Sequence, residues 1–411
     1  MNWIIPAWIV QTNFEHLLIQ PCRIDIIKEI EYLLKMPYTN KTFQQRVHAV
    51  VRVLFAVFLF FYFLYSQAPL ISLAQHQLSK GQTFYSPFVG AVVLTLLLCG
   101  LQRLVCRFIR FRRNYYILTF FPSASIAVLL TAFTPETNYV VVVLLVVMWL
   151  IWFGLVWHDS IMGGWKQNND ENGVVLPQTI GFLALAMFLG LCGNSNDVLT
   201  YEVQTAKALN DGRYAEALKI GDRALATSDK LTAMRAFAMS HYENGLPETL
   251  FKYPLPEGGS SMLFLQKDDT LSTLFSPDSL YTYVGCRPAS SRMKAFEYFE
   301  KSVHRRPNGP ARDYWLCALL LDKQLSRFAE ELPHYYTVSD SVVLPHYYAE
   351  AMILYSRLCQ NPVVRYADPN IAANYLDFKE KGEKIPDFKE RRNLLWREYG
   401  DTYWWYFFYH Q

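Results

Sequence analysis

The stretch Arg103-Leu-Val-Cys-Arg-Phe-Ile-Arg-Phe-Arg-Arg113 connects two apolar segments, each long enough to cross a lipid bilayer. Basic side chains in so short a connection resist transfer across the membrane during insertion. We therefore predict that the connection stays in the cytoplasm and orients the chain. The topology-setting residues are Arg103, Arg107, Arg110, Arg112 and Arg113.

Five segments approach the roughly 20 apolar residues that a membrane-spanning helix needs. They cover residues 50–71, 84–104, 115–133, 139–157 and 175–192. One buried helix of a soluble protein can be this apolar, but five in succession indicate an integral membrane protein. We predict an all-α chain with a five-helix transmembrane bundle over residues 50–193.

Residues 1–49 form an amphipathic and basic region that we expect on the cytoplasmic side. Apolar and charged residues alternate with helical spacing between residues 26 and 35, as in helices that lie on a membrane surface. Two interpretations of residues 1–35 stay open. They form such a helix, or they are a start-site extension and translation begins at Met36.

The distribution of charge predicts the location of the C-terminal half. The loops opposite the basic connection, residues 66–83 and 134–138, contain a single basic residue, Lys80. An odd number of spans then places residues 194–411 outside the cytoplasm, on the periplasmic face of a multi-pass inner-membrane protein. Residues 1–194 carry a net charge of +5 and residues 195–411 a net charge of −2, so no basic surface remains for nucleic acid.

The C-terminal half has the pattern of a tetratricopeptide-like helical-repeat domain. In Leu209-Asn-Asp-Gly-Arg-Tyr-Ala-Glu-Ala-Leu-Lys-Ile-Gly-Asp-Arg-Ala-Leu225, Gly212 closes a turn and Tyr214 begins a second helix. Residues 294–307 repeat the spacing of small and aromatic positions. Residues 254–288 interrupt the period and are rich in Gly, Ser, Asp and Pro, so we interpret them as an insertion.

Aromatic residues supply the candidates for partner binding or packing. The string Leu-Pro-His-Tyr-Tyr occurs at residues 332–336 and 344–348, and His346 and Glu350 share one helical face. Two histidines without a typical ligand spacing do not support a metal site, and no motif indicates a cofactor. The chain ends in seven consecutive aromatic residues, which we expect to cap the last repeat. The candidates are Tyr335, His346, Tyr347, Glu350, Tyr403, Trp404 and Trp405.

Three cysteines of the C-terminal half, Cys286, Cys317 and Cys359, allow at most one internal disulfide. Burial of all three as small apolar residues is the alternative. No Cys-x-x-Cys pair occurs, which argues against zinc ribbons and thioredoxin-like chemistry.

The ending Gly400-Asp-Thr-Tyr-Trp-Trp-Tyr406, together with five spans and a repeat-like outer half, resembles an uncharacterised family of bacterial multi-span membrane proteins with a tetratricopeptide-like C-terminal region. The resemblance begins at about Thr42. It implies the architecture described above and brings no activity or catalytic residues.

The sequence therefore favours a membrane-anchored interaction or scaffold module of the bacterial cell envelope, which binds a protein or peptide through its outer helical domain. The alternative is a lipid-linked envelope enzyme, such as a multi-span glycosyltransferase-like protein. Such enzymes place an acidic residue in the first outer loop, whereas residues 66–83 contain no Asp or Glu. No phosphate-binding loop, nucleophile elbow or zinc-protease motif occurs in the chain.

Overall fold

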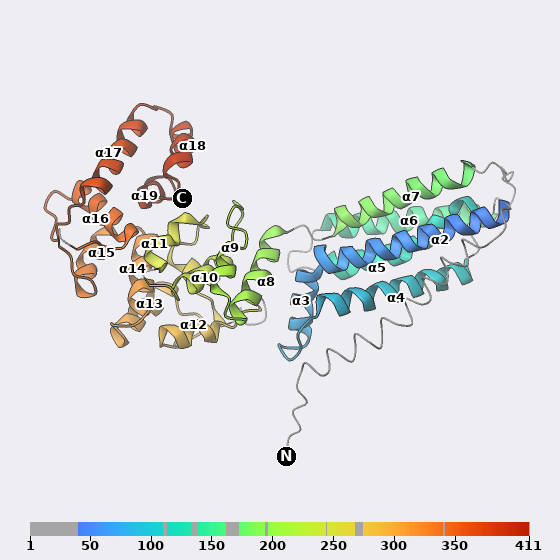
Figure 1. The fold of residues 1–411 in the computed structure, drawn as a ribbon, viewed down its shortest axis with the longest axis horizontal. Coiled ribbons are helices and arrows are strands. Elements are labelled where there is room, and N and C mark those ends of the chain that lie inside the picture. The colour runs from blue at the N-terminus through green and yellow to red at the C-terminus, as the bar shows by residue number, and fades with distance from the viewer. Residues whose placement is uncertain are drawn as a thin grey trace, which may run out of the picture. The chain divides into compact units, whose positions relative to one another are not determined.

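The computed structural model describes residues 40–109, 113–132, 139–161, 172–193, 196–243, 245–267, 274–339 and 342–410. Within these ranges every regular element is helical (Figure 1). The chain divides into two compact units. The described parts of unit 1 lie within Met1–Gln75 and Thr83–Ser195, and those of unit 2 within His76–Gln82 and Asn196–Gln411.

Unit 1 consists of apolar helices that run side by side (Figure 1). Three helices are long and apolar enough to cross a membrane, namely Phe43–Ser66, Pro87–Phe108 and Val175–Cys192, and two shorter apolar helices cover Tyr116–Thr131 and Val142–Trp157. The elements in chain order are α2 (Asn40–Phe61), η1 (Tyr62–Ser66), α3 (Ala68–Leu78), α4 (Pro87–Phe108), η2 (Arg113–Phe120), α5 (Phe121–Ala132), α6 (Tyr139–Ile161) and α7 (Asn172–Cys192).

The first apolar helix differs from the predicted segment at both ends. Helix α2 begins at Asn40 because polar residues before the apolar run continue the helix without a Gly or Pro to break it. A π-helical turn, Tyr62–Ser66, follows α2, and a separate helix, α3, begins at Ala68 with proline at its second residue. Residues 66–83 are therefore largely helical, where the sequence predicted a loop.

The predicted third span also has two parts. A 3-10 helix, η2, precedes α5, and Pro122 lies in the first turn of α5, where its missing N–H leaves no hydrogen bond unmade. Ser123, which follows the proline, donates from its hydroxyl to the carbonyl oxygen of Leu98 in α4 at 2.8 Å. Of the topology-setting arginines, Arg103 and Arg107 lie on α4 and Arg113 begins η2. Arg110 and Arg112 lie outside the described residues, as do residues 1–35.

Unit 2 is built around three buried helices, α10 (Asp229–Met239), α14 (Ala311–Leu321) and α16 (His346–Leu358). Almost all residues of α14 are buried, as expected for a helix that is apolar on every side. The surrounding elements are α8 (Asp197–Asn210), α9 (Tyr214–Lys219), α11 (Gly245–Thr249), η3 (Leu250–Lys252), η4 (Gly259–Leu263), α12 (Pro277–Val284), α13 (Ala295–Arg305), α15 (Leu325–Glu331), η6 (Leu332–His334), α17 (Pro369–Glu383), α18 (Phe388–Tyr399) and α19 (Tyr403–Tyr409).

The first predicted repeat has its turn at Gly212, which adopts a left-handed conformation with φ of 72°. Its second helix, α9, ends at Lys219 rather than near Leu225. Gly221 is left-handed, with φ of 62°, and the buried guanidinium of Arg235 donates to the carbonyl oxygens of Ile220 and Gly221 at 2.9 and 3.0 Å. A side chain from another helix therefore satisfies the end of α9, which a local pattern does not reveal.

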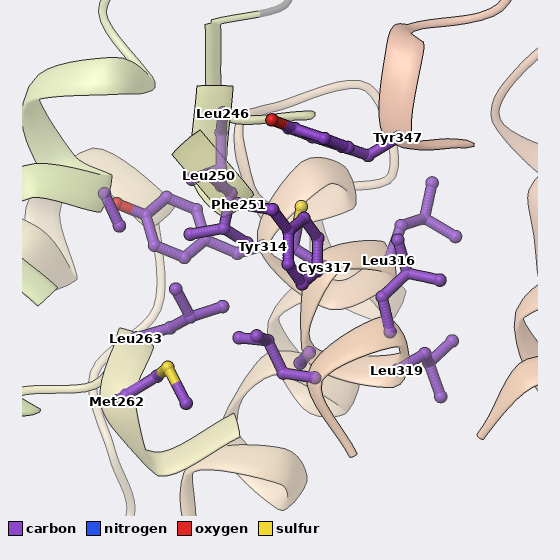
Figure 2. Packing of buried hydrophobic residues seen from close by; sticks show 14 of the residues in the cluster. Leu246, Leu250, Phe251, Met262, Leu263, Tyr314, Leu316, Cys317, Leu319 and Tyr347 are labelled. Carbon is purple, nitrogen blue, oxygen red and sulfur yellow. The ribbon is translucent and has the colours of Figure 1, made fainter. Parts of the chain in front are cut away.

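Residues 254–288 contribute to the core of unit 2. Residues 262–265 are buried, and the hydroxyl of Tyr281 in α12 donates to the carbonyl oxygen of Leu265 at 2.5 Å. Figure 2 shows Leu246 and Phe251 of the preceding segment beside α14, with Met262 and Leu263 nearby. The described part of the predicted insertion is an integral layer of the fold, because its apolar residues cover α14.

Candidate functional site

The C-terminal aromatic run folds into helix α19. The hydroxyl of Thr402 caps the helix by accepting the backbone N–H of Trp405 at 3.3 Å. Five of the seven aromatic side chains are buried, and only Phe408 is more than a third exposed. The run packs against α14, α16 and α18, and its capping of a last repeat stays a prediction.

Two tyrosine hydroxyls hold α19 against the end of α14. Tyr406 donates to the carbonyl oxygen of Leu321 at 2.8 Å, and Tyr403 donates to that of Leu320 at 3.3 Å. Both carbonyls belong to the last turn of α14; that of Leu321 has no partner within the helix, whereas that of Leu320 also accepts the backbone N–H of Lys323 at 3.0 Å. The ammonium of Lys323 donates to the carbonyl oxygen of His410 and lies 5.6 Å from the centroid of the Tyr406 ring.

A buried carboxylate holds the other end of α19. Glu350 is 1% exposed, and its Oε2 accepts the backbone N–H of Tyr403 at 2.6 Å. Its Oε1 lies 3.1 Å from Nε2 of His346, one turn earlier on α16. The backbone N–H of His346 donates to Oε1 of Glu248 in α11 at 2.9 Å. One network therefore connects the starts of α16 and α19 to α11.

The two titratable side chains of this network influence each other. Burial raises the pKa of the Glu350 carboxyl group, although His346 and the N–H of Tyr403 act in the opposite direction. The hydrogen bond to Glu350 raises the pKa of His346. The pair therefore retains a proton to higher pH than the separate groups would.

A cleft of about 530 Å³ opens beside α19, and we call it the C-terminal cleft. One wall comes from α18 and α19 and includes Arg392, Trp396 and Trp405. The facing wall comes from residues 251–257 and includes Tyr253 and Glu257. The indole N–H of Trp405 donates to the carbonyl oxygen of Arg392 at 3.3 Å, which joins α19 to α18 within the first wall. Nε2 of His410 donates to the carbonyl oxygen of Leu255 at 2.9 Å, which joins the two walls.

The cleft combines aromatic surface with charges of both signs. Trp396 is 44% exposed, and the buried Trp405 and Tyr406 also line the cleft. Within the part of the chain that the structure describes, neither the guanidinium of Arg392 nor the carboxylate of Glu257 has a protein partner. A bound molecule can therefore stack on aromatic rings and pair with a cation on one wall and an anion on the other.

The structure separates the predicted candidates into groups. His346, Glu350 and Tyr403 form the network described above, and Tyr347 and Tyr403 both pack against Phe251, with ring centroids 4.9 and 5.4 Å away. Of the candidates, only Trp405 lines the C-terminal cleft. Trp404 turns toward Tyr375 and Phe378, and Tyr335 lies elsewhere, beside Glu331 and His334.

Sequence reasoning missed three residues that line the cleft, the half-buried Arg392 and the exposed Trp396 and Glu257. Arg392 and Trp396 are four residues apart on α18 and therefore share a helical face, which is a signal the sequence does contain. The opposite wall is about 140 residues away along the chain, so nothing local indicates that Glu257 faces them. In the described residues, no group of three or more His, Cys, Asp or Glu side chains could hold a metal ion.

The fold and the cleft define a class: an all-helical protein with apolar helices long enough to cross a membrane and a second helical unit that carries an aromatic cleft. The chain belongs to a family of unknown function, DUF6057, which matches residues 81–194 and 302–410. The match includes α18 and α19 but not residues 251–257, so it covers one wall of the cleft. Neither a curated protein nor a solved structure matches the chain.

Proposed function

We propose that this protein is a membrane-anchored interaction module of the bacterial cell envelope, and that an extended segment of a partner protein binds in its C-terminal cleft. The observation that carries the proposal is the cleft itself. Its volume of about 530 Å³ falls within the roughly 300–1,000 Å³ of ligand pockets. The residues that line it include Trp, Tyr and Arg, the types that contribute most to protein–protein binding energy.

The charges in the cleft support a peptide as its occupant. Arg392 can pair with a carboxylate or a main-chain carbonyl, and Glu257 can accept from a main-chain N–H or a basic side chain. The ring of Trp396, one helical turn after Arg392, offers a flat apolar surface for a side chain. An extended peptide carries all of these groups at short intervals along its length.

The membrane part of the proposal is a five-span bundle in the inner membrane, with a cytoplasmic N-terminus and a periplasmic, tetratricopeptide-like unit 2. Three helices have the required length and composition. Helix α6 has 23 residues and is therefore roughly 34 Å long. At 2.0 and 1.5 Å per residue, η2 followed by α5 reaches a similar roughly 34 Å, and both lengths include polar residues beyond the apolar parts Tyr116–Thr131 and Val142–Trp157.

Site-specific photocrosslinking in native membranes tests the proposal. Asn393 is exposed and lines the cleft, so a photoreactive amino acid at residue 393 should crosslink one protein reproducibly. The same probe at Lys301, an exposed residue of α13 outside the cleft, is the matched control. The substitution Trp396→Ala should abolish the adduct formed at residue 393.

Mass spectrometry of the adduct then identifies the crosslinked segment. A synthetic peptide of that segment should bind the purified full-length protein in calorimetry and lose affinity with Arg392→Ala. Adducts that contain only lipid or glycan, or equal adducts from both probe positions, would contradict a peptide-binding role.

A further inference from the structure

Two cations lie against tyrosine rings that line the C-terminal cleft. The guanidinium of Arg235 in α10 is 5.1 Å from the centroid of the Tyr253 ring, and the ammonium of Lys323 is 5.6 Å from that of the Tyr406 ring. The two rings belong to the two facing walls of the cleft, whereas neither cation lines it. Each wall therefore has a positive charge one side chain away from the space that an occupant fills.

The charge of Arg235 is only partly compensated inside unit 2. The residue is 1% exposed, and its Nη2 makes the two hydrogen bonds to the end of α9, while its Nε and Nη1 have no hydrogen-bond partner among the described residues. No carboxylate in that part of the chain forms an ion pair with Arg235, and Asp222 acts on it only at longer range. Burial accordingly lowers the pKa of the guanidinium group. A buried cation without an anionic partner is unfavourable, so an anion nearby would stabilise it.

Lys323 is in a similar situation beside the other wall. Its ammonium donates to the carbonyl oxygen of His410, which is a neutral acceptor, and burial lowers the pKa of this lysine. The carboxylate of the adjacent Asp322 accepts the backbone N–H of Ser260 at 2.7 Å instead. Within the described ranges no carboxylate forms an ion pair with Lys323, so its charge also favours an anion in the cleft.

These contacts determine which charge the cleft favours. An aromatic face attracts cations, but each of the two tyrosine rings already holds one, so a basic side chain of a partner is repelled there. Arg392 adds a positive charge in the wall itself. Among the described residues that line the cleft, Glu257 is the only acidic one, and it is exposed. Solvent screens the charge of Glu257, whereas the charge of the buried Arg235 is screened much less.

We propose that the segment bound in the C-terminal cleft is acidic, and that it presents a carboxylate side chain to Arg392 in the positive field of Arg235 and Lys323. This inference rests on the peptide-binding function proposed above and specifies the chemistry of the partner. Main-chain N–H groups of the same segment pair with Glu257. Arg235 and Lys323 set the preference for negative charge through the tyrosine rings, without contacting the partner.

Selection from a phage-displayed library of random peptides against the detergent-purified full-length protein tests this inference. Peptides that bind the wild-type protein but not the Trp396→Ala variant are occupants of the cleft. Among them we expect Asp and Glu to be enriched over Lys and Arg. Replacing these carboxylates with amides in a synthetic peptide should weaken binding about tenfold or more, because a charge-assisted hydrogen bond to Arg392 is lost. Fluorescence polarisation measures the two dissociation constants.

The substitution Lys323→Gln tests the long-range part of the inference. It keeps a donor for His410 and removes the charge, so the preference for the acidic peptide over its amide version should fall about two- to fivefold, while the amide version binds as before. Lys323→Arg keeps the charge and should keep the preference. Lys301→Gln removes the same charge from an exposed position outside the cleft and is the matched control. Lys323 is chosen because Arg235 also holds the end of α9, so its loss would disturb the fold.

Different results would overturn the inference and the function on which it rests. Peptides that depend on Trp396 but carry no excess of acidic residues, or that bind equally well as amides, would refute the acidic segment and leave the peptide-binding function in place. An equal fall in preference with Lys323→Gln and Lys301→Gln would refute the role of Lys323. A library without any binder that depends on Trp396 would instead refute the peptide-binding function itself.

Discussion

The substitution Tyr406→Phe tests how the C-terminal helix is held in unit 2. The hydroxyl of Tyr406 donates to the carbonyl oxygen of Leu321 at 2.8 Å, and both residues are buried. Leu321 ends α14, so its carbonyl has no partner within the helix. Removing the hydroxyl leaves that buried carbonyl unpaired, and we expect a loss of about 1–3 kcal/mol in the free energy of unfolding.

Hydrogen–deuterium exchange of peptides that cover α14 and α19 measures this loss directly. In the regime where exchange reports the opening equilibrium, 1–3 kcal/mol corresponds to roughly 5- to 150-fold faster exchange. Tyr403→Phe should have a smaller effect, because the carbonyl of Leu320 also accepts the backbone N–H of Lys323 at 3.0 Å.

Tyr409→Phe is the matched control on the same helix. Its hydroxyl has no hydrogen-bond partner among the described residues, so its removal should change exchange very little. If Tyr406→Phe and Tyr409→Phe gave the same exchange rates, aromatic packing alone would hold α19, and the argument from main-chain pairing would be refuted.

Three further perturbations follow from the same region. Deleting residues 401–411 removes several buried aromatic side chains, and the loss of each one costs about 3–5 kcal/mol of folding free energy. Unit 2 should therefore lose its cooperative unfolding transition in circular dichroism. An unchanged melting temperature would contradict this. The pKa of Glu350 is raised above 4.5 and that of His346 above 6.5, so the folded state keeps protons that the unfolded chain releases, and stability should fall as pH rises from about 4.5. Thermal melts of Glu350→Gln should show a flatter dependence of melting temperature on pH. An equal slope in the variant and the wild-type protein would exclude the pair as the source of that dependence. Cys317 is buried and burial raises the pKa of its thiol, so maleimide should label Cys359 in the folded protein and Cys317 only after unfolding, which peptide mass spectrometry can distinguish.

The all-helical class and the positions of the apolar segments could be predicted because they depend on local composition. Helix α4 begins at Pro87, as proline at the first helical turn favours, and α7 covers the whole of the predicted segment 175–192. The pairing of His346 with Glu350 also follows from helical spacing, since residues four apart lie on one face. The network beyond that pair, through Glu248 and Tyr403, joins three helices and has no local pattern.

The basic connection Arg103–Arg113 illustrates the same division. Its charge is local and predicts an orientation, which stays a prediction. Arg52 precedes Arg103 by about 50 residues in the sequence. Both line one pocket only because α4 packs against α2. Hydropathy had placed Arg52 at the edge of the first span, whereas the observed helix extends beyond it in both directions.

The aromatic ending shows most clearly what the sequence determined by itself and what the tertiary structure decided. Seven consecutive aromatic residues must be buried, because solvating so much apolar surface is unfavourable, and the sequence alone requires this. Where they are buried depends on partners elsewhere: the carbonyls of α14 about 85 residues earlier and the carboxylate of Glu350 about 50 residues earlier. Every residue has a main-chain carbonyl and every residue except proline an N–H group, so only the folded chain determines which of them lack a partner and can receive α19.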